Sequence, residues 1–273
     1  MESAQAPQRL AIQLLGDFRV SVASRAIDER EWRLRKARSL VKLLALAPRH
    51  RLHREHIMDR LWPDIDPEDG ANNLHKALYV TRRILEPDLP PRRASSYLQL
   101  RHDLLVLEAP AGLWIDVEAF LAAAKEAHER RTPQAYQEAL RLYTGDLVPE
   151  DHYEDWVIAH RERLSGLRVT LLVELAGVQE QTGDFSAAIE TLQQAVGSDP
   201  LHEEAQGLLM RLLVQAGRRH LALRQYQALR AALQRELEVE SDATLQALYQ
   251  DVQAGRVAQG SGSALLRVVN EQM

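Results

Sequence analysis

The sequence predicts a mainly α, multidomain protein, with an α+β domain at the N-terminus followed by an all-α helical array. In the first 110 residues, short alternating apolar runs flank three stretches of helical periodicity. From residue 116 onward the pattern is almost entirely helical, and one helical pattern recurs after 34 residues. The chain has 273 residues, of which 45% are hydrophobic and 27% are charged, which is enough for two cored domains.

Charge is distributed unevenly along the chain. The whole sequence carries a net charge of −5, which by itself argues against a nucleic-acid partner. Residues 1–110, however, hold 19 Lys and Arg against 15 Asp and Glu, a net of +4, whereas residues 111–273 have a net of −9. A basic first part and an acidic second part are expected when only one domain meets phosphate.

The first 110 residues contain five predicted elements whose order is typical of a winged helix-turn-helix. Alternating apolar residues around Gly16-Asp17 indicate a hairpin, and prolines end the first two helical stretches. In order, the elements are a hairpin at residues 10–22, a helix ending at Pro48, a short helix from about His53 to Trp62, a third helix at 66–86, and a terminal hairpin at 97–108.

The third helix is the strongest candidate for a DNA-reading element. Its apolar residues recur at three- and four-residue steps and form one stripe, made of Leu74, Ala77, Leu78, Thr81, Ile84 and Leu85. Another face collects Asn72, Asn73, Lys76, Tyr79 and Arg83. Asn can pair with adenine, Arg with guanine and Lys with phosphate, so this face fits a major groove. The alternative is a solvated helix face beside a core.

Further basic residues suggest peripheral contacts with a nucleic acid. The cations that open the first helix oppose its dipole, which favours a phosphate partner over a purely local role, although a solvated cluster is the alternative. The terminal hairpin could lie along the neighbouring backbone as a wing. The predicted peripheral contacts are Arg35, Lys36, His75, Arg82 and Arg101, with His102, Arg92 and Arg93 near the wing.

The second part of the chain contains an internal repeat of helical pairs. Gly183 and Gly217 are 34 residues apart and each precedes a helical stretch, and 34 residues is the tetratricopeptide (TPR) period. Equivalent positions carry small or apolar residues, namely Ala188 with Ala222, Leu192 with Tyr226 and Ala195 with Leu229. Stacked helical pairs of this kind leave a concave face for protein partners.

No pattern in the sequence argues for an enzyme, a metal site or a cofactor. Residues 64–70 echo a calcium loop, but Gly70 is one place late and His75 stands where the closing Glu belongs. His53 and His56 lack a third ligand, and no nucleophile motif is evident. The absence of cysteine, of a long apolar run and of a signal-peptide core leads us to expect a cytoplasmic protein without a membrane partner.

Both parts resemble known families. Residues 9–108, with LLGDFRV, DRLWPD and ANNLHKALYVTRRILEP, resemble the OmpR/PhoB-type winged helix of SARP-type bacterial transcriptional activators. Thr81 stands where that family usually has leucine. Residues 113–255, with LWIDVEAF, LYTGDLVPEDHYEDW and TGDFSAAIETL, resemble the bacterial transcriptional activator domain, whose fold is TPR-like. Residues 256–273 are expected to form a flexible tail.

The resemblance implies a sequence-specific transcriptional regulator, expected to be an activator. It implies double-stranded DNA with promoter repeats as the target, RNA polymerase as a protein partner, and a homodimer on DNA. The alternative is a TPR-type adaptor whose winged helix binds protein rather than DNA. Strong salt dependence of DNA binding would separate the two.

Overall fold

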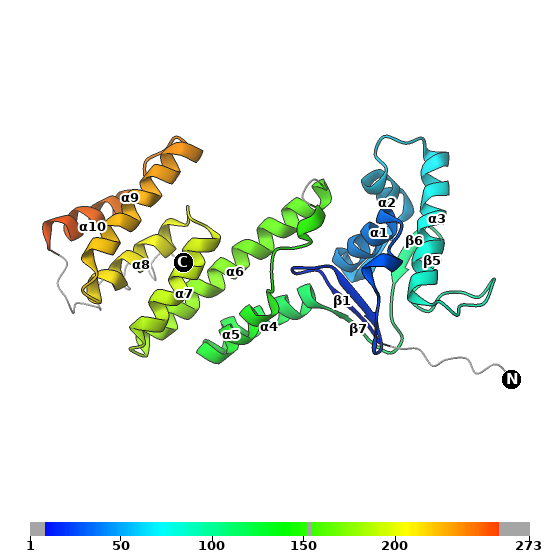
Figure 1. Ribbon diagram of the computed structural model, residues 1–273, viewed down its shortest axis with the longest axis horizontal. Helices are drawn as coiled ribbons and strands as arrows, with labels where there is room; N and C mark the ends of the chain where they lie inside the picture. The colour runs from blue at the N-terminus through cyan, green and yellow to red at the C-terminus, as the bar shows by residue number, and fades with distance from the viewer. Residues whose placement is uncertain (1–8, 152–153, 257–273) are drawn as a thin grey trace. The chain divides into compact units, whose positions relative to one another are not determined.

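The computed structural model describes residues 9–151 and 154–256. The chain forms two compact units (Figure 1). Unit 1 contains the chain up to residue 123 together with residues 141–162, and unit 2 contains residues 124–140 and the chain from residue 163 onward.

A four-stranded sheet opens unit 1. Its strand order is β3-β2-β1-β7, with β1 Leu10–Gln13, β2 Arg19–Val22, β3 Arg25–Ala26 and β7 Leu113–Ile115. Strands β1 and β2 pair antiparallel, as the sequence predicts, whereas β7 runs parallel to β1 and pairs Leu10 with Leu113. Strand β7 was not predicted from the sequence. Its partner strand is about a hundred residues away, and no local pattern reports such a pairing.

The turn after β1 is built around two glycines that approach each other closely. Gly16 has a φ of +79°, a conformation that glycine adopts without steric cost. A Cβ added at Gly145 would lie 3.0 Å from the Cα of Gly16. Two hydrogen bonds join the segments that carry these glycines. The Gly16 amide donates to the Asp146 carbonyl at 2.9 Å, and Thr144 Oγ1 donates to the Leu15 carbonyl at 2.6 Å.

Three helices form the centre of unit 1, and Figure 1 shows them grouped with strands β5 and β6. They are α1 Arg35–Leu46, α2 Arg54–Leu61 and α3 Pro67–Leu85, and each packs against the other two. All six residues of the predicted apolar stripe of α3 are buried. Thr81 is fully buried there and its hydroxyl donates to the Ala77 carbonyl at 2.8 Å, so the polar atom in the leucine position is satisfied.

A second sheet supplies the wing. Its strand order is β4-β6-β5, with β4 Arg51–His53, β5 Leu98–Arg101 and β6 Leu104–Leu107. The hairpin β5–β6 lies within the range predicted from the sequence, residues 97–108; it turns at His102-Asp103 and pairs Arg101 with Leu104. Short 3₁₀ helices complete this unit at Glu29–Glu31, Pro48–His50 and Pro149–Asp151. The predicted winged helix-turn-helix is therefore confirmed.

Unit 2 consists of helices, and the predicted repeat forms its core. The boundaries between the units fall inside three helices, namely α4 Asp116–Arg130, α5 Pro133–Leu142 and α6 Asp155–Gln181. The remaining helices are α7 Phe185–Ser198, α8 Glu203–Gln215, α9 Arg219–Glu236 and α10 Ala243–Ala254. Helix α8 packs against both α7 and α9.

The six equivalent repeat positions are all buried, in one continuous hydrophobic cluster. Gly183 and Gly217 both have positive φ, so the same turn recurs before α7 and α9. The mainly α fold with a TPR-like array is confirmed. The predicted domain limits, 9–108 and 113–255, remain a prediction, and the predicted tail lies outside the described residues except for Arg256.

Candidate nucleic-acid interface

Helix α3 is held at both ends, which fixes the direction of its exposed face. At its start, Asp66 Oδ1 accepts the Glu68 amide at 3.0 Å and Pro67 occupies the first turn. At its end, Arg25 Nη2 donates to the Ile84 carbonyl at 2.6 Å, so a cation satisfies a free carbonyl of the last turn. The start agrees with the helix predicted at residues 66–86, whereas the contact of Arg25 was not predicted from the sequence.

The predicted contact residues of α3 lie on its exposed side. Asn72, Lys76, Tyr79 and Arg83 are exposed and follow one another by three or four residues, so they form a single stripe. At a rise of about 1.5 Å per residue the stripe extends over roughly 16 Å. Asn73 is half-buried beside it, and His75 is exposed on a neighbouring line. The structure therefore brings the four residues of the stripe together on one accessible surface.

Arg82 and Arg83 are both tied to the segment that follows α3. Arg83 Nη1 donates to the Leu89 carbonyl at 2.9 Å, and Arg82 Nε donates to the Leu98 carbonyl of β5 at 3.0 Å. Burial lowers the pKa of Arg82, with the Glu86 carboxylate acting in the opposite direction. Arg82 thus holds the wing against α3, and Arg83 stays exposed with further donors available.

The wing is braced by carboxylates. Glu86 accepts the Ser95 hydroxyl in a short hydrogen bond and the Ser96 amide at 3.1 Å, which closes the loop that carries Arg92 and Arg93. Arg101 donates to Gln99 Oε1 at 2.9 Å and pairs with Glu108. The positive charge of Arg101 is therefore partly compensated, although its side chain remains exposed.

The acidic start of α3 borders this surface. A shallow hollow there is lined by Asp64, Ile65, Asp66, Asp69, Asn72 and Asn73. Carboxylates repel phosphate, so a nucleic acid that reaches Asn72 and Asn73 must approach from the side of Lys76.

Within residues 9–151 and 154–256, no group of three or more His, Asp or Glu side chains could hold a metal ion.

The basic residues at the start of α1 face carboxylates of a distant segment. Arg35 Nη2 lies 3.4 Å and Lys36 Nζ 3.8 Å from Glu154 Oε1. Arg38 lies between Glu29, at 3.1 Å, and Glu150, at 3.2 Å. Arg35 and Lys36 were predicted to contact phosphate; their pairing with Glu154 was not predicted, because more than a hundred residues separate it from them.

Lys42 was not predicted from the sequence either, and its side chain is the least exposed of the charged side chains in this region. Its side chain is 2% exposed, and Nζ lies 2.6 Å from Asp151 Oδ2 and 2.7 Å from Glu150 Oε1. The same ammonium group stands 4.8 Å from the centre of the Phe18 ring. Lys42 follows Arg35 and Arg38 by seven and four residues, so this helical spacing was the one available sequence signal.

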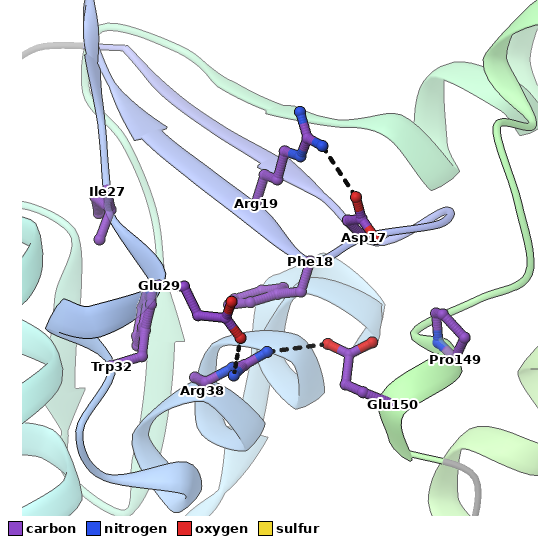
Figure 2. Close-up of a pocket in the computed structure, with 9 residues that line it drawn as sticks. All are labelled: Asp17, Phe18, Arg19, Ile27, Glu29, Trp32, Arg38, Pro149 and Glu150. Carbon is purple, nitrogen blue, oxygen red and sulfur yellow. Dashed lines mark hydrogen bonds and ion pairs between the residues drawn. The ribbon is translucent and has the colours of Figure 1, made fainter.

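A hollow of about 500 Å³ lies beside this cluster (Figure 2). Phe18 and Trp32 line it and meet edge to face, with ring centres 5.5 Å apart. Figure 2 shows Arg38 reaching between Glu29 and Glu150, and Asp17 beside Arg19. The charged groups that line the hollow thus pair with one another, which is the arrangement of a structural junction between α1, the first hairpin and the segment around Pro149.

The three packed helices, the hairpin wing and the exposed polar stripe define a winged helix-turn-helix protein with an appended TPR-like array. The bacterial transcriptional activator domain family matches residues 115–253, about half of the chain. The chain belongs to this family.

No helix in the described parts of the chain is long and apolar enough to cross a membrane.

Two curated relatives agree with this assignment. The chain is 28% identical over 225 residues to the transcriptional regulator RedD of Streptomyces coelicolor, covering 80% of this chain and 64% of RedD, so it spans less than two thirds of that relative's length. It is 27% identical to the regulatory protein DnrI of Streptomyces peucetius, over 78% of this chain and 82% of DnrI. These matches confirm the resemblance to SARP-type regulators.

The fold also matches a solved structure of Mycobacterium tuberculosis EmbR, determined in complex with a low-affinity phosphopeptide. The TM-score is 0.72 at 19% identity, and the match covers 96% of this chain and 71% of the EmbR chain. At this level of identity the comparison shows a shared fold, which includes both the N-terminal and the C-terminal parts described above.

Proposed function

We propose that this protein is a sequence-specific transcriptional regulator that binds double-stranded DNA and acts as an activator. The observation that carries the proposal is the exposed stripe of Asn72, Lys76, Tyr79 and Arg83 on a helix fixed at both ends. Amide, guanidinium and ammonium groups on an accessible helix are the groups that contact base edges and phosphates in a major groove. The relatives named as regulators support the same activity.

The other predicted residues take supporting roles in this proposal. Arg82 orients the wing. Arg101 and His102 at the wing, together with His75 and Asn73 on α3, would lie at the edge of the contact. Promoter repeats would be bound by a homodimer, and the TPR-like array would meet RNA polymerase. We propose no catalytic activity and no cofactor, and we expect the protein to act in the cytoplasm.

Selection of bound duplexes from a random pool at two salt concentrations tests the function. Spaced repeats that remain enriched at the higher salt are the expected result, and their spacing would report the geometry of the dimer. Enrichment of no sequence at either salt concentration would contradict the proposal and favour the alternative, an adaptor whose winged helix binds protein.

Replacing Arg83 by alanine should weaken binding to a selected site by about 1–3 kcal/mol, or roughly 5- to 150-fold. Arginine can donate two parallel hydrogen bonds to guanine, and alanine cannot. Binding should be measured by fluorescence anisotropy on the selected duplex and on a scrambled one. Arg83→Lys is the matched control, since it keeps the charge but cannot donate two parallel hydrogen bonds to guanine. It should restore only the sequence-independent part of the DNA affinity. Equal affinities of wild type and Arg83→Ala for the selected duplex would show that Arg83 does not contact the DNA.

Replacing Lys36 by alanine should weaken binding to all sequences alike if the Glu154 pair opens on DNA. The plot of log affinity against log salt should then become less steep by about one unit, because one fewer phosphate is neutralised. Anisotropy titrations at four or more salt concentrations measure this slope. An unchanged slope would leave Lys36 as a partner of Glu154 only. Unchanged affinity in both the Lys36 and the Arg83 variants would contradict the whole assignment of the surface.

A further inference from the structure

Tyr79 is the most exposed large hydrophobic side chain among residues 9–151 and 154–256. Its exposed fraction is 67%, against 56% for Leu237 and 46% for Phe185. It lies in the middle of the polar stripe of α3, three residues after Lys76 and four before Arg83. The aromatic ring therefore stands alone between two cations on the surface that we assign to DNA.

The exposure of Tyr79 has no explanation within unit 1. The apolar stripe on the other side of α3 buries Leu74 and Leu78 to 2% and 3% exposure, so the core of the helix is complete without the ring. Tyrosine is also a weaker helix former than the Arg, Lys or Leu residues around it, so it gives no local advantage on a wet helix face. The ring gains most if another molecule covers it.

One feature of a DNA major groove matches an apolar ring. The groove edges of the bases present hydrogen-bond donors and acceptors, and thymine alone adds a C5 methyl group that side chains contact through apolar surface. The cations one turn away on either side would lie against phosphates or guanines, which directs the ring toward the base edges between them. An aromatic side chain at this position can therefore distinguish thymine from cytosine without any hydrogen bond.

We propose that Tyr79 recognises a thymine in the target sequence through contact of its ring with the C5 methyl group. This inference rests on the proposed function and adds to it the identity of one base. The contact comes from the ring, so the phenol hydroxyl is not required. Each half-site that one protomer binds should contain one such thymine, next to the base that Arg83 contacts.

Deoxyuridine scanning tests the inference, because deoxyuridine lacks only the methyl group of thymine. Each thymine of a selected duplex is replaced in turn, and affinity is measured for wild type, Tyr79→Phe and Tyr79→Ala. One position per half-site should weaken wild type and Tyr79→Phe by about fourfold, the effect of burying one carbon group. At that position Tyr79→Ala should bind the thymine and deoxyuridine duplexes equally. Phe185→Ala, which removes an exposed ring from α7, is the matched control and should keep the sensitivity of wild type.

Three results would overturn the inference. Wild type could bind every deoxyuridine duplex as tightly as the parent, or Tyr79→Ala could keep the full methyl effect. Tyr79→Phe could also lose as much affinity as Tyr79→Ala while wild type binds thymine and deoxyuridine duplexes equally. That result would mean that the phenol hydroxyl contacts a phosphate and that the ring contacts no methyl group. In all three cases a sequence has been selected, so the proposed function stands. A pool that enriches no sequence removes both the function and the inference.

Discussion

Replacement of Lys42 by alanine should lower the free energy of unfolding of unit 1 by about 3–5 kcal/mol. The substitution removes the cation that lies 2.6 Å from Asp151 and 2.7 Å from Glu150. Asp151 is 4% exposed, and among the described residues it would keep only Arg35, at 4.0 Å, as a nearby cation. A buried carboxylate that loses its partner is the main source of the expected loss.

Tryptophan fluorescence in urea measures this effect on unit 1 alone. All four tryptophans, Trp32, Trp62, Trp114 and Trp156, belong to unit 1. Lys36→Ala is the matched control on the same helix, since its pair with Glu154 is longer and more exposed and should contribute at most about 1 kcal/mol. The double variant Lys42→Met with Asp151→Leu replaces the pair by apolar side chains and should recover most of the loss. An equal, small effect of Lys42→Ala and Lys36→Ala would contradict the structural role of Lys42.

The same cluster predicts a dependence of stability on acid. Burial would raise the pKa of Glu150, but its hydrogen bonds from Lys42 and the backbone, with the charges of Lys42 and Arg38, outweigh burial and lower it. A carboxyl whose pKa is lowered on folding stabilises the protein fully above its unfolded pKa, about 4.3. That contribution is lost as the pH falls through the lowered pKa. Lys42→Ala should therefore be less sensitive to acid than wild type in the same urea titrations.

Replacement of Asp116 by alanine should destabilise unit 1 by a similar amount, about 3–5 kcal/mol, because it leaves several buried amides without an acceptor. The carboxylate of Asp116 is 2% exposed and accepts the amides of Leu14 at 2.9 Å, Leu15 at 2.8 Å and Val117 at 2.8 Å. It thus ties the end of β1 to the start of α4. Urea unfolding followed by tryptophan fluorescence measures the change.

Asp116→Asn is the informative companion variant. Asparagine keeps one oxygen as an acceptor but turns an NH₂ group toward the remaining amides, so we expect a loss smaller than that of alanine but still clear. Burial raises the pKa of Asp116, and hydrogen bonds from Leu15, Leu14 and Val117 oppose this only in part. The raised pKa means that the contribution of Asp116 declines as the pH rises from the unfolded to the folded pKa, opposite in sign to Glu150. Wild-type stability in Asp116→Ala would show that water replaces the carboxylate.

The prediction of α3 from sequence succeeded because its determinants are local. The apolar stripe from Leu74 to Leu85 and the start at Asp66 and Pro67 involve residues within a few positions of one another. The exposed stripe follows from the same periodicity. The 34-residue repeat was visible for a related reason, since each helical pair must present the same small and apolar residues to its neighbours.

Contacts between distant residues decided the rest. Arg35 and Lys36 were predicted as peripheral contacts with a nucleic acid, whereas chain folding places Glu154 beside them. Arg82 was expected at DNA, yet it also donates to the Leu98 carbonyl and so positions the wing. Strand β7 and Asp116 act through partners about a hundred residues away. Neither periodicity nor capping reports such partners, because both depend on neighbours within four residues.

The sequence by itself determined the mainly α fold class, the winged helix, the helical repeat and the residues that face outward on α3. Only the tertiary structure decided which of the basic residues remain available to a partner and which are held by carboxylates such as Glu150, Asp151 and Glu154. The physical reason is that helix periodicity sets the direction of a side chain, whereas the electrostatic interactions of a charge depend on every group within a few ångströms, wherever it lies in the chain.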